Sequence, residues 1–176
     1  WAAGSAATPI EELAMHSDQR RVALETAAGR VVWMCAPRAD SPALFGELIG
    51  GPTAGYFDIR PAEDHAEAGQ RYLRETNIIE TRWGALTVTD YLDCSGSRPT
   101  QRAGRSDLVR VVGGAGRVKI EFAPRLAFGR VPTRLIAREG GLVVEGLADP
   151  PVLRPPVIRW TISPEGPPHT PPGVRP

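Results

Sequence analysis

The sequence predicts an all-β fold, an antiparallel β-sandwich with one or two short helices. Between the turns, most segments alternate apolar and polar residues with a period of two, which is typical of strands with one buried face. The 19 glycines and 18 prolines interrupt the 176-residue chain often, so the strands should be short. Many short strands with no helices between them favour a sandwich over a parallel α/β sheet.

A short helix is predicted at residues 8–11. Thr8 stands at the cap, Pro9 lies in the first turn, and Glu11 follows the cap by three residues, which is the capping-box arrangement. The helix should therefore begin at Thr8, with the threonine hydroxyl accepting a backbone N–H.

A second, longer helix is predicted between residues 40 and 50. Asp40 or Ser41 can cap it, Pro42 can start it, and the glycines and proline at 50–52 should stop it. Its apolar face would consist of Leu44, Phe45, Leu48 and Ile49.

The clearest strand is residues 117–122, in which every second side chain is apolar. Val118, Ile120 and Phe122 should point into the core. Similar runs predict further strands at residues 21–26, 30–35, 55–60, 71–74, 78–83, 86–91, 108–112, 133–137, 142–147 and 158–162. Turns are expected between them at residues 27–29, 113–116 and 139–141.

Composition argues against several classes of function. The 21 basic and 20 acidic residues nearly cancel, which leaves a net charge of +1 and no basic block for nucleic acid or an anionic membrane. No apolar run approaches the roughly 20 residues that a membrane helix needs, and no secretory signal is visible. Because Cys35 and Cys94 are the two cysteines, we expect two buried thiols in a reducing compartment and place the protein in the cytoplasm.

Residue types that carry chemistry are present but scattered. His16, His65 and His169 are far apart in the sequence, so we expect no metal site and no cofactor. No serine lies in a G-x-S-x-G elbow. The glycines at 113–116 lack the G-x-G-x-x-G spacing and the following helix of a phosphate site. A catalytic residue of these classes is therefore not expected.

One carboxylate stands out, because glycoside cleavage commonly uses a pair of carboxyl groups. Asp90 shares strand parity with the apolar Leu86 and Val88, and it lies close to Asp93 in the sequence. The favoured interpretation is structural: Asp90 is a hydrogen-bonded carboxylate that ends its strand or pairs with an arginine.

Aromatic side chains can stack on sugar rings, which keeps a carbohydrate-binding face open as an alternative. The candidates are Trp33, Trp83, Trp160, Tyr56, Tyr72 and Tyr91. Core packing explains the strand alternation of these residues equally well, and we favour it.

Residues 33–45 carry a distinctive motif, Trp-Met-Cys-Ala-Pro-Arg-Ala-Asp-Ser-Pro-Ala-Leu-Phe. This segment resembles the W-x-C-x-P-R-F-D-S-P-x-x-F motif near the start of bacterial glucoamylase-like and trehalase-like enzymes, family 15 of the glycoside hydrolases. Ala39 stands where that family usually has phenylalanine, so the segment lacks one large side chain.

Further segments resemble the same family in the same order, from Thr8 to Arg130. Upstream, residues 8–10 and 17–24 are similar to its T-P-I and G-D-x-R-T-A-A-L patterns, with Ser17 in place of glycine. The downstream matches are residues 55–61 (G-x-x-x-I-x-P), 71–73 with 77–81 (R-Y-x-x-x-T-N-x-L-E-T), 88–91 (V-T-D-F), 108–110 (L-V-R) and 124–130 (P-R-F-x-Y-G-R).

The resemblance implies an N-terminal, supersandwich-like β-domain in front of a C-terminal (α/α)₆ barrel that supplies the catalytic glutamates. It carries no catalytic residue onto this chain, because the matching segments all belong to the β-domain. We expect the domain at residues 1–163 and a proline-rich tail or interdomain linker at residues 164–176. The implied partner is the barrel in the same polypeptide, and the implied substrate of the complete enzyme is trehalose or an α-glucan.

The leading hypothesis is a non-catalytic domain that packs against the barrel and borders its active-site cleft through residues 37–42. Arg38, Asp40 and Ser41 are the predicted interface or cleft-lining residues, because such polar groups can form charge-assisted hydrogen bonds across a domain interface. An internal Arg38–Asp40 or Arg38–backbone bond is equally compatible with the sequence. The alternatives are a stand-alone carbohydrate-binding module and a complete small enzyme that uses Asp40, Asp90 or Asp93.

Overall fold

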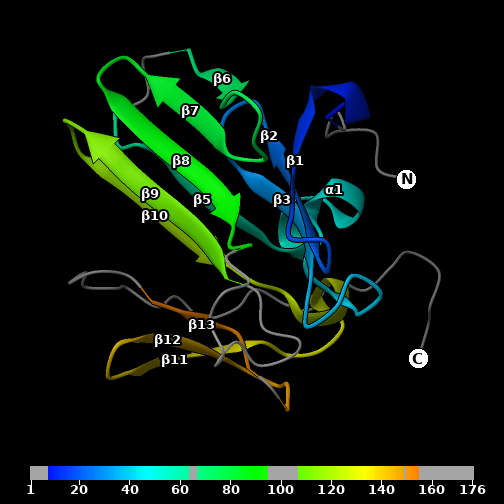
Figure 1. Cartoon of the computed structure of the whole chain (residues 1–176). Helices are drawn as coiled ribbons and strands as arrows, with labels where there is room; N and C mark the ends of the chain where they lie inside the picture. The colour runs from blue at the N-terminus through cyan, green and yellow to red at the C-terminus, as the bar shows by residue number, and fades with distance from the viewer. Residues whose placement is uncertain (1–7, 64–66, 95–106, 149, 155–176) are drawn as a thin grey trace.

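The computed structural model describes residues 8–63, 67–94, 107–148 and 150–154. Three antiparallel sheets make up most of this part of the chain (Figure 1). Tight turns and short helices connect the strands, as the glycine and proline content predicts. The fold is an all-β sandwich, which confirms the predicted fold class.

The largest sheet has six strands in the order β1-β2-β3-β5-β10, with β4 paired to β3. Its strands are β1 (Leu13–Ser17), β2 (Val22–Thr26), β3 (Val31–Cys35), β4 (Ala43–Phe45), β5 (Tyr56–Pro61) and β10 (Val118–Ala123). The second sheet consists of β6 (Gly69–Tyr72), β7 (Ile79–Trp83), β8 (Leu86–Leu92) and β9 (Leu108–Gly114). The third sheet joins β11 (Arg134–Arg138), β12 (Gly141–Glu145) and β13 (Val152–Leu153).

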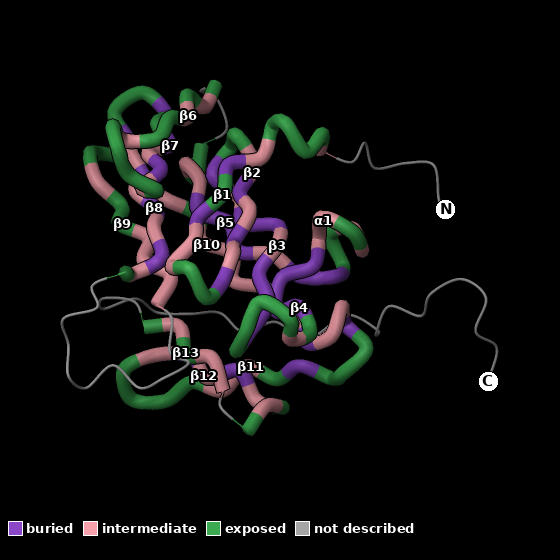
Figure 2. The backbone as a smooth tube through the Cα atoms, turned by 45° about the vertical axis from the view of Figure 1, so that its right-hand side comes forward, coloured by how far each residue is buried: buried purple, intermediate pink, exposed green. Residues whose placement is uncertain are grey.

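The core lies between the six-stranded and the four-stranded sheet, and Figure 2 shows much of the buried chain along β3, β4 and β5. The ring of Phe122 packs edge to face on Phe45 and Phe57, with centroid distances of 5.9 and 5.2 Å. Trp83 and Val88 from the four-stranded sheet belong to the same cluster. Burying side chains of this size contributes roughly 1.5–3 kcal/mol each, so this cluster joins the two sheets.

The alternation predicted for residues 117–122 is confirmed. β10 pairs antiparallel with β5, which places Ile120 opposite Ile59 and Phe122 opposite Phe57. Val118, Ile120 and Phe122 all pack against the core cluster. The other predicted strands are also present, with ends shifted by a few residues, except 158–162, which lies outside the described residues. β1, β4 and β13 are strands that the sequence pattern did not predict.

The predicted capping box is wrong. The chain forms a single 3₁₀ turn, η1 (Ile10–Glu12), whose N-cap is Pro9 and which has no side-chain cap bond. Because proline has no hydroxyl or carboxylate, it cannot cap as Thr8 was expected to do.

The second predicted helix is wrong over most of its length. Only α1 (Glu47–Gly50) is helical, and Gly46 precedes it as the N-cap. Leu44 and Phe45 are buried, but as residues of β4. Ile49, expected on the same apolar face, is 72% exposed. The physical reason is that β4 pairs with β3 and obtains its backbone hydrogen bonds there.

The remaining described helices are the 3₁₀ turns η2 (Pro52–Ala54) and η3 (Leu126–Gly129). In the part of the chain that the structure describes, no helix is long and apolar enough to cross a membrane. Cys35 is buried as predicted, whereas Cys94 is exposed, because it lies beyond the end of β8.

Candidate interdomain surface

The predicted site residues lie on the 37–42 loop, which joins β3 to β4. Both flanking strands are buried, with Cys35 5% exposed and Ala43 1% exposed. The pairing of these two strands fixes both ends of the loop. The loop itself is largely exposed, so a rigid scaffold presents a polar segment to the surroundings.

Ser41 shapes the loop from within. Its Oγ accepts the backbone N–H of Arg38 at 3.1 Å, and its own N–H donates to the Arg38 carbonyl at 3.1 Å. These two bonds close a tight turn. Ser41 therefore positions the turn, and its predicted role as a helix cap is wrong because no helix begins there.

Arg38 and Asp40 project outward from this turn. Arg38 Nη2 donates to Asp40 Oδ2 at 3.1 Å, so the internal pair that the sequence left open does form. Their side chains are 73% and 71% exposed. A pair this exposed contributes about 0–1 kcal/mol to stability. Because both side chains are exposed and weakly held, both remain accessible to a partner.

Arg20 is a neighbour of this loop that sequence reasoning missed. It lies in the turn between β1 and β2, where Asp18 Oδ1 accepts the N–H groups of Arg20 and Arg21 at 2.9 and 2.7 Å. Together with residues 37–40, Arg20 lines an open hollow of about 370 Å³. The hollow thus offers two guanidinium groups and one carboxylate, beside the small side chain of Ala39.

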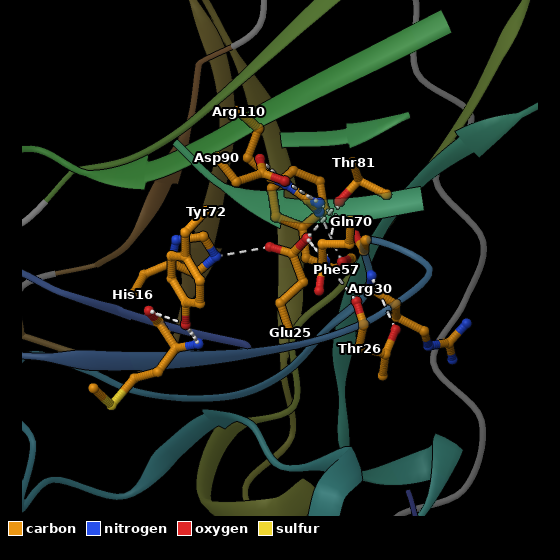
Figure 3. A network of polar contacts seen from close by, with 12 residues as sticks. His16, Glu25, Thr26, Arg30, Phe57, Gln70, Tyr72, Thr81, Asp90 and Arg110 are labelled. Atoms are coloured by element: carbon orange, nitrogen blue, oxygen red, sulfur yellow. Dashed lines mark hydrogen bonds and ion pairs between the residues drawn. The ribbon is translucent and has the colours of Figure 1, made fainter. Parts of the chain in front are cut away.

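A second polar cluster is buried between the two large sheets (Figure 3). Asp90 on β8 and Arg110 on β9 are cross-strand partners. Arg110 Nε and Nη2 donate to the two carboxylate oxygens at 2.8 and 3.1 Å, and the Arg110 and Asp90 side chains are 3% and 0% exposed. The Arg110 guanidinium also donates to the carbonyls of Phe57 and Gly29. Arg110 therefore ties the four-stranded sheet to the six-stranded one.

This pair confirms the structural interpretation of Asp90, whose partner is an arginine. Burial raises the pKa of Asp90 to about 6, against the lowering effect of Arg110. Asp93 lies beyond the end of β8, where its N–H donates to the carbonyl of Asp107 at 2.9 Å. Because Asp90 is fully buried and held by two hydrogen bonds, it has no route to a sugar.

His16 and Glu25 extend the cluster, as Figure 3 shows. His16 Nε2 lies 2.7 Å from Glu25 Oε2, and both side chains are 0% exposed. The other oxygen, Glu25 Oε1, accepts from Gln70 Nε2 at 3.1 Å and from Thr81 Oγ1 at 3.3 Å. One carboxylate on β2 thus collects polar groups from β1, β6 and β7.

The buried groups do not form a metal site or an activated nucleophile in the part of the chain described. No group of three or more His, Cys, Asp and Glu side chains that could hold a metal ion occurs there. Burial raises the pKa of the Cys35 thiol, and the charge of Asp40 adds to the effect, so the unreactive thiol form dominates. His65 and His169 lie outside the described residues.

The aromatic candidates do not gather on one open face within the described residues. Trp83 is 6% exposed in the core. The Arg30 guanidinium lies over the ring of Tyr56, 3.5 Å from its centroid. Tyr72 is 48% exposed, and its hydroxyl is bonded to the backbone of β1. Trp160 lies outside the described residues.

These features define a class: an all-β sandwich domain with a hydrogen-bonded polar interior and an outward polar loop. The chain belongs to the trehalase-like N-terminal family, whose model matches residues 1–173. The trehalases of Mycobacterium tuberculosis and Mycolicibacterium smegmatis are each 39% identical over 88 residues, which cover 48% of this chain and 13% of each relative. Trehalase 1 of Sulfolobus acidocaldarius is 45% identical over 53 residues, 30% of this chain and 9% of the relative.

The matched segment is a small part of each of these relatives, at most 13% of the mycobacterial trehalases. No solved structure matches the chain. The family membership confirms the resemblance to trehalase-like N-terminal domains that the motifs of residues 8–130 predicted.

Proposed function

We propose that this chain is the N-terminal accessory domain of a trehalase-like enzyme of glycoside hydrolase family 15, and that it packs against a C-terminal (α/α)₆ catalytic barrel in the same polypeptide. In the complete enzyme, the barrel hydrolyses an α-glucosidic bond of trehalose or an α-glucan. The domain comprises residues 1–163 and borders the cleft, and residues 164–176 form the linker. The free thiols of Cys35 and Cys94 fit a cytoplasmic location.

The observation that supports the proposal is the exposed Arg38–Asp40 pair on a rigid frame. In water such a pair adds little stability. Across a desolvated interface, each charge-assisted hydrogen bond contributes roughly 1.5–3 kcal/mol. Arg38 and Asp40 exchange their mutual bond for bonds to the barrel, and Arg20 adds a third charged group beside them.

The test uses the complete gene product with Arg38→Ala and Asp40→Ala as separate variants. Loss of one interfacial charge-assisted bond should lower kcat/KM for trehalose roughly tenfold to a hundredfold. Arg74→Ala is the matched control, because Arg74 pairs with Glu75 at 3.2 Å and is 93% exposed in the turn between β6 and β7. Its kcat/KM should stay at the wild-type value.

Two results would count against the proposal. Equal effects of Arg38→Ala and Arg74→Ala on kcat/KM would show that the 37–42 loop is an ordinary surface. Saturable binding of maltooligosaccharides or trehalose by the 176-residue chain alone, measured by calorimetry, would replace the packing role with a carbohydrate-binding module.

A further inference from the structure

The outer face of the six-stranded sheet carries apolar side chains in a row across three strands. Met15 on β1 pairs with Leu24 on β2, and Leu24 pairs with Trp33 on β3, so the three side chains point to the same side. The ring of Phe128 continues the row, 5.7 Å from the ring of Trp33. Met15 is 46% exposed, and the other three are half-buried. We call these four residues the apolar row.

On β5 and β10 the same sheet face carries mostly charged side chains, beside Tyr56 at the start of β5. On β5 and β10 the outward positions hold Asp58 opposite Glu121 and Arg60 opposite Lys119. Ion pairs join Arg60 to Asp58 at 3.3 Å and Lys119 to Glu121 at 3.1 Å. A sheet face that contacts water normally carries polar side chains on all of its strands. The apolar row is therefore a local departure within one sheet.

The outer face of the four-stranded sheet gives a second contrast. Its outward positions on β7 and β8 include Glu80 opposite Thr89 and Arg82 opposite Thr87. Glu80 also pairs with Arg71 of β6 at 2.7 Å. This face is polar on β6 and β7, while Tyr91, Val109 and Val111 add apolar positions on β8 and β9. The apolar row differs because no charged side chain interrupts it across three strands, and a contiguous apolar patch marks an interaction surface.

The backbone that holds Phe128 in the apolar row is strained. Ala127 and Phe128 have φ angles of 50° and 62°, in the left-handed region that non-glycine residues rarely adopt. The ring rests where Gly46 has no side chain: a Cβ on Gly46 would come within 2.7 Å of Phe128 Cδ1. Strain of this kind persists where the surrounding structure enforces it, and here it places an aromatic ring over Trp33.

The hollow at the 37–42 loop lies beyond the ends of the two strands that carry Leu24 and Trp33. Moving from Leu24 toward the start of β2, the chain reaches Arg20, and moving from Trp33 past the end of β3, it reaches Pro37. Arg20 and Pro37 both line the hollow. One surface therefore has an apolar centre and a charged margin, which is the usual composition of a protein interface.

We propose that the apolar row is the centre of the surface that docks the catalytic part of the same polypeptide, with the 37–42 loop at its margin. This inference rests on the proposed function. The occupant is that part because the matched segments cover only 13% of the mycobacterial trehalases, so most of such a polypeptide lies outside them. The face of the catalytic part that docks here has an apolar centre, and its hydrogen-bond acceptors lie where they meet Arg20 and Arg38.

Hydroxyl-radical footprinting tests the proposal by comparing the 176-residue chain with the complete gene product. Labelling of Met15, Trp33 and Phe128 should fall several-fold in the complete enzyme. Tyr91, on the outer face of the four-stranded sheet, is the internal control and should be labelled equally in both. A thiol introduced by Ala39→Cys in a Cys94→Ser background reports separately on burial of the loop through its rate of maleimide labelling.

The outcomes separate the two proposals. If the introduced thiol is protected but the apolar row is labelled as in the isolated chain, the inference is overturned and the loop interface stands. If neither is protected, the proposed function fails as well. Protection of the apolar row in the isolated chain would also overturn the inference. If that protection increases with protein concentration, a second copy of the chain covers the row. If it disappears when residues 155–176 are removed, those residues cover it.

A matched pair of variants provides an independent readout. Met15→Lys places a charge in the apolar row, and Val111→Lys places one on β9, where Val111 is 49% exposed against 46% for Met15. In the isolated chain, both should unfold at the wild-type temperature. In the complete enzyme, Met15→Lys alone should restore labelling of Trp33. Unchanged protection of Trp33 in that variant would overturn the inference.

Discussion

Two arginine–aspartate pairs of this molecule share their chemistry but not their setting. Arg110 and Asp90 meet through two hydrogen bonds of 2.8 and 3.1 Å, and their side chains are 3% and 0% exposed. Arg38 and Asp40 share one bond of 3.1 Å, and their side chains are 73% and 71% exposed. The first pair joins two sheets, whereas the second joins residues of one loop.

The difference shows that the surroundings, rather than the residue types, decide what such a pair does. Removing one partner of a buried pair leaves a charge without water or a counter-ion, which destabilises a protein by about 3–5 kcal/mol. Water replaces the lost partner of an exposed pair at almost no loss. The buried pair therefore belongs to the fold, and the exposed pair is left to an external partner.

The largest expected effect is that of Arg110→Met. The substitution leaves the Asp90 carboxylate buried and also removes the donor to the Phe57 carbonyl at 2.9 Å. The free energy of unfolding, measured by urea denaturation of the 176-residue chain, should fall by about 3–5 kcal/mol. The double variant Arg110→Met with Asp90→Leu should recover part of this loss, because no unpaired charge remains. A double variant no more stable than the single one would contradict the buried-charge explanation.

The pH dependence of stability is the next test of the buried pair. Burial raises the pKa of Asp90 to about 6 from its usual 3.8, so the folded state takes up this proton before the unfolded state does. The contribution of Asp90 to the free energy of unfolding should therefore increase as the pH falls from 7 to 4. It is lost again as the pH rises through 6.

The measurement is the difference in unfolding free energy between the wild-type chain and Asp90→Asn across that pH range. The wild-type chain should gain stability relative to Asp90→Asn as the pH falls, because asparagine cannot take up the proton. A difference for Asp90→Asn that shrinks toward low pH would show that Arg110 outweighs burial.

Most strands of this fold could be predicted because they have one buried face. Residues 117–122 alternate cleanly, and Val118, Ile120 and Phe122 do pack on the core. β4 could not be predicted in this way, since all three of its residues are buried. A short strand buried on both faces gives a continuous apolar run, which has no period to distinguish it from a helix. With Pro42 before it and glycines after it, the run fitted a capped helix equally well.

The candidate site was predictable only as far as local sequence reaches. Arg38, Asp40 and Ser41 are neighbours in the chain, and their mutual contacts follow from that. Arg20 joins the hollow only because β2 pairs with β3 and brings the two turns together.

The partner of Asp90 raises the same difficulty. The sequence indicated an arginine but not which one, because the register of β8 against β9 selects Arg110. The pairing register depends on contacts between segments that are distant in the sequence. The periodicity of a single strand does not determine which residue of the next strand lies opposite.

The smallest expected effect is that of Arg38→Ala on the 176-residue chain itself. Water can replace the single exposed bond to Asp40, so the free energy of unfolding should change by no more than about 0.5 kcal/mol. Arg74→Ala, which removes a comparably exposed pair, should behave the same. This near-zero result matters because it assigns any loss of activity by Arg38→Ala in the complete enzyme to the interface. A loss above about 1 kcal/mol in urea denaturation would place Arg38 with Arg110 among the residues that hold the fold.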